Sequence, residues 1–158
     1  NTCNNISSLY MAREHIEDAI ILDGDQIIYN DTILHAEFER SGYNCTWTDT
    51  DTDEWLLTVE NGIVKSCSRS GGKNGWQLYS ISRWTAQDGK KLKNHLELEF
   101  EIKKNHQIYW DDIALFCHPE DYQLGIDKMD CKDVIEIDSL YELAQTDEHY
   151  KKYIHGGL

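Results

Sequence analysis

The 158-residue chain is short enough for one domain, and its 40% hydrophobic residues suffice for a core. Its net charge of −14 argues against binding to nucleic-acid polymers, which require a basic surface. No stretch approaches the roughly 20 apolar residues that span a bilayer, so we expect no membrane insertion. The five cysteines are scattered without a C-x-x-C pair, which disfavours a disulfide framework and favours a cytoplasmic location.

The chain opens with a predicted amphipathic helix over residues 4–18, because Ile6, Leu9 and Ile16 fall on one face. This helix leads into the apolar run of residues 19–22, which is short enough to be a buried strand. A helix that feeds a strand is half of a β-α-β unit. We therefore expect the strand that precedes this helix to lie upstream of the sequence.

A β-hairpin is the most specific local prediction. Residues 55–59 and 63–67 are rich in strand-forming side chains, and Asn61-Gly62 lies between them. An Asn-Gly pair favours a type I′ turn, which needs positive φ at both central residues. Before this hairpin, we expect residues 25–29 to be extended and residues 32–40 to be helical.

The second half of the chain alternates between strand and helix patterns. Thr85 and Ser139 each occupy an N-cap position before a helical pattern. The expected elements are a strand at 76–82, helices at 85–104 and 111–117, a strand at 134–137 and a closing helix at 139–153.

Acidic residues follow two of the apolar runs. Asp25 comes shortly after residues 19–22, and Glu136 and Asp138 end the run that begins at Val134. In open α/β sheets, ligands gather at the carboxyl ends of strands, and Mg²⁺ prefers carboxylate oxygens. The pattern predicts a magnesium site for phosphate chemistry. The alternative is that these acids only form turns, where Asp is common.

Aromatic residues adjoin acids at two places, Trp55 after Glu54 and Tyr109-Trp110 before Asp111. Aromatic faces attract cations, and quaternary ammonium groups are held in such cages. A choline head group would fit there. The alternative is that the tryptophans simply pack in the core.

Two other segments have the composition of ligand-binding loops. Residues 71–75 form a glycine-rich loop near Arg69 and Lys73 that could close over an anion, although it matches no phosphate-binding motif and could be only a flexible connection. Residues 49–60 imitate a calcium-binding loop, but Glu54 occupies the position that requires glycine. A solvated acidic turn is the alternative for this second segment.

Five short motifs occur in an order that resembles a known family. The chain is similar to the bacterial CTP:phosphocholine cytidylyltransferases of the sugar-phosphate nucleotidyltransferase superfamily. The motifs are N-N-I-S-S-L-Y (4–10), I-L-D-G-D (21–25), D-E-W-L-L (53–57), I-Y-W-D-D (108–112) and I-E-I-D-S (135–139).

The resemblance implies an α/β fold, a Rossmann-like (GT-A-like) mixed sheet with flanking helices. Residues 1–158 would form a single partial domain, the C-terminal two thirds of such an enzyme. Asp25, Glu136 and Asp138 fall on the family's Mg²⁺ ligands, with Asp25 and Asp138 as its catalytic acids. Trp55, Tyr109 and Asp111 fall on its choline pocket, and Trp110 lies adjacent to them. The implied reaction joins CTP and phosphocholine to give CDP-choline and pyrophosphate.

The chain departs from the family at one point. The glycine-rich nucleotide signature, with an arginine followed by a lysine, has no counterpart in these 158 residues. We therefore expect the N-terminal nucleotide-binding part to be missing, the chain alone to be inactive, and the edge at residues 19–22 to favour self-association. Another acceptor, 2-aminoethylphosphonate or a sugar phosphate, is the alternative to phosphocholine. A calcium-binding module is the non-enzymatic alternative.

Overall fold

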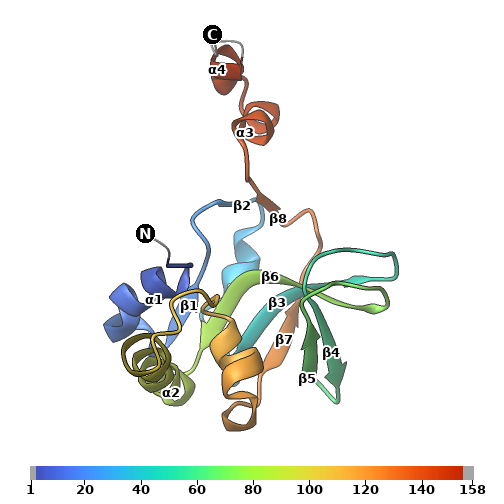
Figure 1. The fold of residues 1–158 in the computed structure, drawn as a ribbon. Coiled ribbons are helices and arrows are strands. Elements are labelled where there is room, and N and C mark those ends of the chain that lie inside the picture. Colours follow the sequence, from blue (N-terminus) through green and yellow to red (C-terminus); the bar gives the residue numbers. More distant parts are fainter. Residues whose placement is uncertain (1–2, 155–158) are drawn as a thin grey trace.

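The computed structural model describes residues 3–154, and β6 (Gly75–Trp84) is the centre of its main sheet (Figure 1). The strand order is β5-β4-β6-β3-β7, and β1 (Ala19–Ile21) also pairs with β6. All neighbours are antiparallel except β3 and β7, so the sheet is mixed, as expected. The remaining strands of this sheet are β3 (Gly42–Thr48), β4 (Leu56–Glu60), β5 (Ile63–Ser68) and β7 (Gly125–Lys128).

The predicted hairpin is confirmed as β4 and β5. Asn61 and Gly62 have φ angles of 52° and 76°, the positive values that a type I′ turn requires. The register pairs Glu60 with Ile63 directly across this turn. The predicted strand at residues 76–82 is also confirmed, and it extends further at both ends as β6.

The sequence reading missed β3 and β7, and it placed a helix at residues 32–40 where the structure has only a 3₁₀ turn, Asp31–Leu34. β3 lies between β6 and β7, and its first four residues are all buried. A strand covered on both faces lacks the polar and apolar alternation that identifies half-buried strands. Gly42 is needed at the β3–β7 contact, because a Cβ there would approach the Gly125 backbone closer than 3.0 Å.

Helical segments cover one face of the sheet and complete the main core around the buried Tyr43 and Trp84. The first predicted helix is shorter than expected, because α1 ends at Ala12 and a 3₁₀ turn follows it. The Thr85 hydroxyl accepts a hydrogen bond from the Asp88 amide, which confirms the predicted cap. These segments are α1 (Ile6–Ala12) with its 3₁₀ turn Arg13–His15, α2 (Ala86–Glu97) with its π-helical extension Leu98–Ile102, the π-helix Ile113–Cys117 and the 3₁₀ turn Pro119–Asp121.

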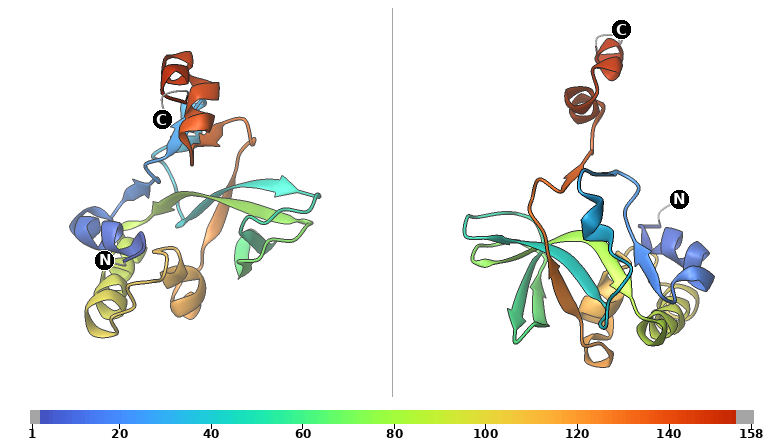
Figure 2. Two further views of the ribbon diagram at one scale, coloured as in Figure 1. Left: turned by 45° about the horizontal axis from the view of Figure 1, so that its top comes forward. Right: turned by 180° about the vertical axis from the view of Figure 1, so that it is seen from behind.

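A separate two-stranded sheet joins β2 (Gln26–Ile28) to β8 (Val134–Glu136). The predicted strand at residues 134–137 therefore exists, but it is not part of the main sheet and only Val134 in it is buried. The chain then leaves the body of the molecule (Figures 1 and 2). The predicted closing helix is capped by Ser139, as expected, but is interrupted, giving α3 (Leu140–Thr146), a 3₁₀ turn (Glu148–Tyr150) and α4 (Lys151–Ile154).

The strand at residues 19–22 does not belong to a parallel unit within the described residues. β1 pairs antiparallel with β6, with Ala19 opposite Trp84 and Ile21 opposite Ser82. Self-association through this edge stays a prediction. Among residues 3–154, none of the helices has the length and apolar character needed to cross a membrane.

Candidate functional site

The structure brings Asp25, Glu136 and Asp138 together at one end of the β2–β8 sheet. One carboxylate oxygen from each lies within 4.8 Å of the others, and all three side chains are exposed. Asp25 directly precedes β2, and the Ile137 amide donates to the Asp25 carbonyl at 2.9 Å. The cause of this convergence differs from the expected one. The antiparallel ribbon formed by β2 and β8 holds these acids together, whereas the sequence predicts strands that end at the same edge of one sheet.

Crowding of like charges affects the protonation of this acid cluster. Although the Glu136 side chain is exposed by its surface area, partial desolvation of its carboxyl group, together with the charges of Asp138 and Asp25, raises the pKa of Glu136 to about 6. Burial also raises the pKa of Asp23, which lies two residues before Asp25. A bound cation would relieve this repulsion, and three carboxylates supply the oxygen ligands that Mg²⁺ prefers. The residues present therefore fit a hard divalent cation.

Trp55 and Tyr109 meet beside the acid cluster, in a cavity of about 260 Å³. Their ring centroids lie 5.7 Å apart at an interplanar angle of 86°. Trp55 stands just before β4, and Tyr109 stands in the loop that leads to the π-helix Ile113–Cys117. The cavity is lined by Asn5, Asp23, Glu54, Trp55, Leu78, Ser80, Tyr109, Asp111 and Glu136. Glu136 is therefore common to the acid cluster and the aromatic cavity.

Asp111 is the buried carboxyl group of this cavity. It is only 4% exposed, and its Oδ1 atom has no hydrogen-bond partner. Burial and the nearby Asp23 raise the pKa of Asp111 well above its ordinary value. A cationic ligand would favour the ionised form of Asp111.

Arg69 supports the aromatic pair from outside the cavity. Its Nη2 donates to Asp112 Oδ1 at 2.5 Å, and Asp112 Oδ2 accepts from the Tyr109 amide at 2.9 Å. Its guanidinium also lies 3.9 Å from the ring centroid of Phe116, which meets Trp55 edge-on. The sequence indicates Arg69 only as a cation near the glycine-rich loop. No local pattern links it to Asp112, which is 43 residues away.

Trp110 lies in the core rather than in the cavity. It is 2% exposed, stacks on Tyr43 at 6.4 Å and meets Trp84 edge-on at 6.3 Å. Its amide donates to the Asn5 side chain at 3.0 Å. Trp110 is thus adjacent to Tyr109 and Asp111 in sequence, but its own ring packs behind them.

Asn5, Asp23, Glu54 and Ser80 also line the cavity, and sequence reasoning did not select them. Asn5, Asp23 and Glu54 stand within the five motifs, so the motifs could have identified them from the sequence. Ser80 has no such signal, because only the pairing of β6 within the sheet brings it near the site.

The other two candidate segments have structural explanations. The Thr52 and Gly72 backbones exchange two hydrogen bonds of 2.9 Å, which fasten the glycine-rich loop to the acidic segment. Gly71 has a φ of 68°, and a Cβ there would approach the Thr52 backbone closer than 3.0 Å. Residues 49–60, which imitate a calcium-binding loop, end within strand β4. Among the described residues, no group of three closely spaced metal-binding side chains includes residues 49–54.

Comparisons with known proteins agree with the resemblance. No protein-family model matches the chain. A 2-aminoethylphosphonate cytidylyltransferase from Lancefieldella rimae is 26% identical over 149 residues, covering 93% of this chain and 60% of that protein. A choline-phosphate cytidylyltransferase from Streptococcus pneumoniae is 21% identical over 148 residues, covering 94% and 64%. The chain therefore spans less than two thirds of the length of either relative.

Solved structures confirm the fold. A CTP:phosphocholine cytidylyltransferase from Streptococcus pneumoniae matches with a TM-score of 0.80 and 21% identity, over 93% of this chain and 64% of that one. A putative glucose-1-phosphate thymidylyltransferase from Bacillus anthracis matches with a TM-score of 0.65 and 11% identity, over 96% and 62%. An inositol-1-phosphate CTP transferase from T. maritima matches with a TM-score of 0.63 and 12% identity, over 99% and 64%. The predicted nucleotidyltransferase-like α/β fold is correct.

Proposed function

We propose that this chain serves the transfer of CMP from CTP to phosphocholine, giving CDP-choline and pyrophosphate. One observation carries the proposal. Glu136 belongs to the acid cluster and also lines the cavity that contains Trp55 and Tyr109. A cation-binding aromatic pair next to a group of metal-binding acids suits a small acceptor with an ammonium group at one end and a phosphate at the other. The similarity to two cytidylyltransferases supports this reading.

In the proposed reaction, a phosphate oxygen of the acceptor attacks the α-phosphorus of CTP. The new P–O bond forms as the bond between the α-phosphorus and the pyrophosphate oxygen breaks. Trp55 and Tyr109 would hold the trimethylammonium group by their ring faces, which require no hydrogen bonds from it. Asp111 and Glu54, which line the same cavity, would add Coulomb attraction. The role of these residues is to position the acceptor, and this reaction needs no covalent intermediate with the protein.

Asp25, Glu136 and Asp138 would hold Mg²⁺ in this proposal. When bound, the ion would neutralise charge on the reacting phosphates. The three side chains would otherwise repel the acceptor phosphate, because they concentrate negative charge within 4.8 Å. Their proximity to the cavity therefore favours phosphate chemistry only when a cation accompanies the substrate.

A second acceptor, 2-aminoethylphosphonate, is favoured by one specific observation. Asp111, whose Oδ1 atom has no hydrogen-bond partner, belongs to a cavity that also contains Asp23, Glu54 and Glu136. A primary ammonium group has N–H donors that would satisfy such acceptors, whereas a trimethylammonium group has none. The relative from Lancefieldella rimae bears the name of this substrate.

Isothermal titration of the chain with each acceptor in the presence of Mg²⁺ tests the proposal. We expect Trp55→Ala to weaken phosphocholine binding by about 1–2 kcal/mol, the value of a desolvated cation–π contact. Trp47→Ala is the matched control, because Trp47 is 52% exposed and does not line the cavity. Equal affinity in both variants would refute the assignment of the cage.

Asp111→Asn separates the two acceptors. This substitution removes the charge but keeps the shape of the side chain. A larger loss for 2-aminoethylphosphonate than for phosphocholine would identify the primary amine as the ligand. A larger loss for phosphocholine in Trp55→Ala would identify the quaternary amine.

A further inference from the structure

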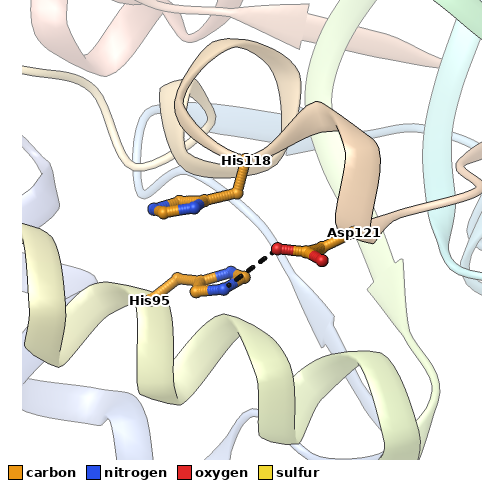
Figure 3. A group of neighbouring side chains, drawn as sticks. All are labelled: His95, His118 and Asp121. Atoms are coloured by element: carbon orange, nitrogen blue, oxygen red, sulfur yellow. Dashed lines mark ion pairs between the residues drawn. The ribbon is translucent and has the colours of Figure 1, made fainter.

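Two histidines and an aspartate lie together, with the rings of His95 and His118 stacked and Asp121 beside them (Figure 3). His95 is on α2, His118 follows the π-helix Ile113–Cys117, and Asp121 ends the 3₁₀ turn after it. One potential ligand atom from each lies within 4.8 Å of the others. His95 Nε2 and Asp121 Oδ2 are 3.4 Å apart. None of the three residues lines the cavity of Trp55 and Tyr109.

Each imidazole has one nitrogen already engaged by a neighbour. His95 Nδ1 lies 2.7 Å from the Tyr122 hydroxyl, and His118 Nε2 lies 2.8 Å from Glu99 Oε1. Glu99 is 1% exposed, and Lys103 and Asn105 hold its two oxygens. Histidines that bind metals commonly donate their second N–H to such a partner, which fixes the ring and its tautomer. His95 Nε2 and His118 Nδ1 remain available.

The cluster is partly sheltered but open to solvent on one side. The side chains of His95 and His118 are 17% and 13% exposed, and that of Asp121 is 49% exposed. A hydrated ion can therefore reach the three side chains from the solvent side, where Asp121 lies. The two imidazoles would shield the ion on the other side. This combination of two nitrogen ligands and one carboxylate differs from the oxygen-only group of Asp25, Glu136 and Asp138.

The two rings stack in the present structure, with centroids 3.9 Å apart and an interplanar angle of 8°. The lone pair of an imidazole nitrogen lies in the plane of its ring, so two parallel rings cannot both direct lone pairs at one ion. Coordination thus requires one ring to turn about its Cβ–Cγ bond. Turning His95 gives up its hydrogen bond with the neutral Tyr122 hydroxyl, which costs less than giving up the contact of His118 with the Glu99 carboxylate.

We propose that His95 Nε2, His118 Nδ1 and the Asp121 carboxylate bind one divalent transition-metal ion of the Zn²⁺ class. Two imidazoles and a carboxylate suit Zn²⁺, with water in the fourth position, whereas Mg²⁺ and Ca²⁺ prefer oxygen ligands only. The ion would join α2 to the turn at Pro119–Asp121. The site is independent of the proposed CMP transfer.

The full chain, freed of metal by a chelator, is titrated with Zn²⁺ by calorimetry and with Co²⁺ by visible absorption. We expect one ion per chain and Co²⁺ bands of the intensity that tetrahedral coordination produces. Asp121→Asn, His95→Ala and His118→Ala should each lower Zn²⁺ affinity at least about tenfold. His15→Ala is the matched control on an exposed histidine, and Glu136→Gln excludes binding at the acid cluster.

Asp121→Asn keeps the experiment decisive if a histidine variant fails to fold, because Asp121 is half-exposed and its substitution leaves the stacked rings intact. Unchanged Zn²⁺ affinity in Asp121→Asn, or in either histidine variant that folds, would overturn the proposal. Affinity lost in Glu136→Gln instead would assign the ion to the other group and would equally overturn it.

Discussion

Gly89 of α2 packs directly against Ile16, so that a Cβ built at Gly89 would approach the Ile16 carbonyl closer than 3.0 Å. The atoms that it would meet belong to the backbone, which cannot move aside as a side chain can. Glycine in the first turns of a helix normally costs about 1 kcal/mol relative to alanine. In this molecule it instead allows α2 to contact the segment that precedes β1.

Gly89→Ala should therefore destabilise the protein, against the helix propensity of alanine. We expect the free energy of unfolding to fall by about 1–3 kcal/mol, the usual cost of overpacking. Urea denaturation followed by circular dichroism measures this change. Lys90→Ala, on the exposed side of the same helix, is the control and should change stability little. A stabilised Gly89→Ala variant would contradict the close packing.

Removal of Arg69 should destabilise the protein through Asp112, whose carboxylate is 3% exposed and would lose its ionic partner. We expect a loss of about 1–3 kcal/mol in the free energy of unfolding, reduced by the partial exposure of Arg69. The double variant Arg69→Ala/Asp112→Asn should lose less than the sum of the two single variants. Additive losses in this double-mutant cycle would show that the pair is not coupled.

Glu99 should contribute to acid sensitivity. Although burial opposes its ionisation, hydrogen bonds from Lys103, Asn105 and His118 lower the pKa of Glu99 below its ordinary value. A carboxyl group with a lowered pKa in the folded state stabilises the protein above its unfolded-state pKa. That contribution is lost as the pH falls through the folded-state pKa.

Glu99→Gln should therefore be less stable than the natural chain near neutral pH, with the difference shrinking below about pH 4.5. Denaturation midpoints in a series of buffers from neutral to acidic pH measure the effect. Glu60→Gln, at the exposed end of β4, is the control. A difference that stays constant with pH would argue against an ionised Glu99 in the folded state.

Cysteine labelling should separate exposed thiols from buried ones. Cys3 and Cys131 are exposed, whereas burial raises the pKa of Cys45 and raises that of Cys67 to about 12. Iodoacetamide reacts with the thiolate, so native protein should be alkylated first at Cys3 and Cys131. Peptide mass spectrometry over time measures the order, and urea should abolish it. Early modification of Cys45 in native protein would contradict the packing of β3.

Features that depend on a few neighbouring residues were predictable from the sequence. The Asn61-Gly62 turn and the caps at Thr85 and Ser139 each follow from local backbone geometry. β3 and β7 were missed, because their pairing depends on residues more than 80 positions apart, such as Gly42 and Gly125. The first four residues of β3 are also all buried, so this strand lacks the alternation of polar and apolar residues that marks a half-buried strand.

The sequence predicted which carboxylates lie together in the candidate site, but not which elements of the fold hold them together. The carboxylates at 25, 136 and 138 do lie together, yet an antiparallel ribbon that the sequence reading did not foresee holds them. The link from Arg69 through Asp112 to Tyr109 could not be read from spacing either, because it crosses from one strand end to a distant loop. Short motifs identify which residues belong to a site, whereas the three-dimensional arrangement determines what supports them.

The positions of Asp25, Glu136 and Asp138 relative to one another depend on the register in which β2 pairs with β8. Gln26 lies opposite Glu136, and side chains on a strand alternate between two faces. A slip of one residue would turn Glu136 and Asp138 to the opposite face of the ribbon and would change their distances from Asp25, which lies outside β2. A cation that binds all three acids would therefore select one alignment of the ribbon, and with it the direction in which the chain departs toward α3 and α4.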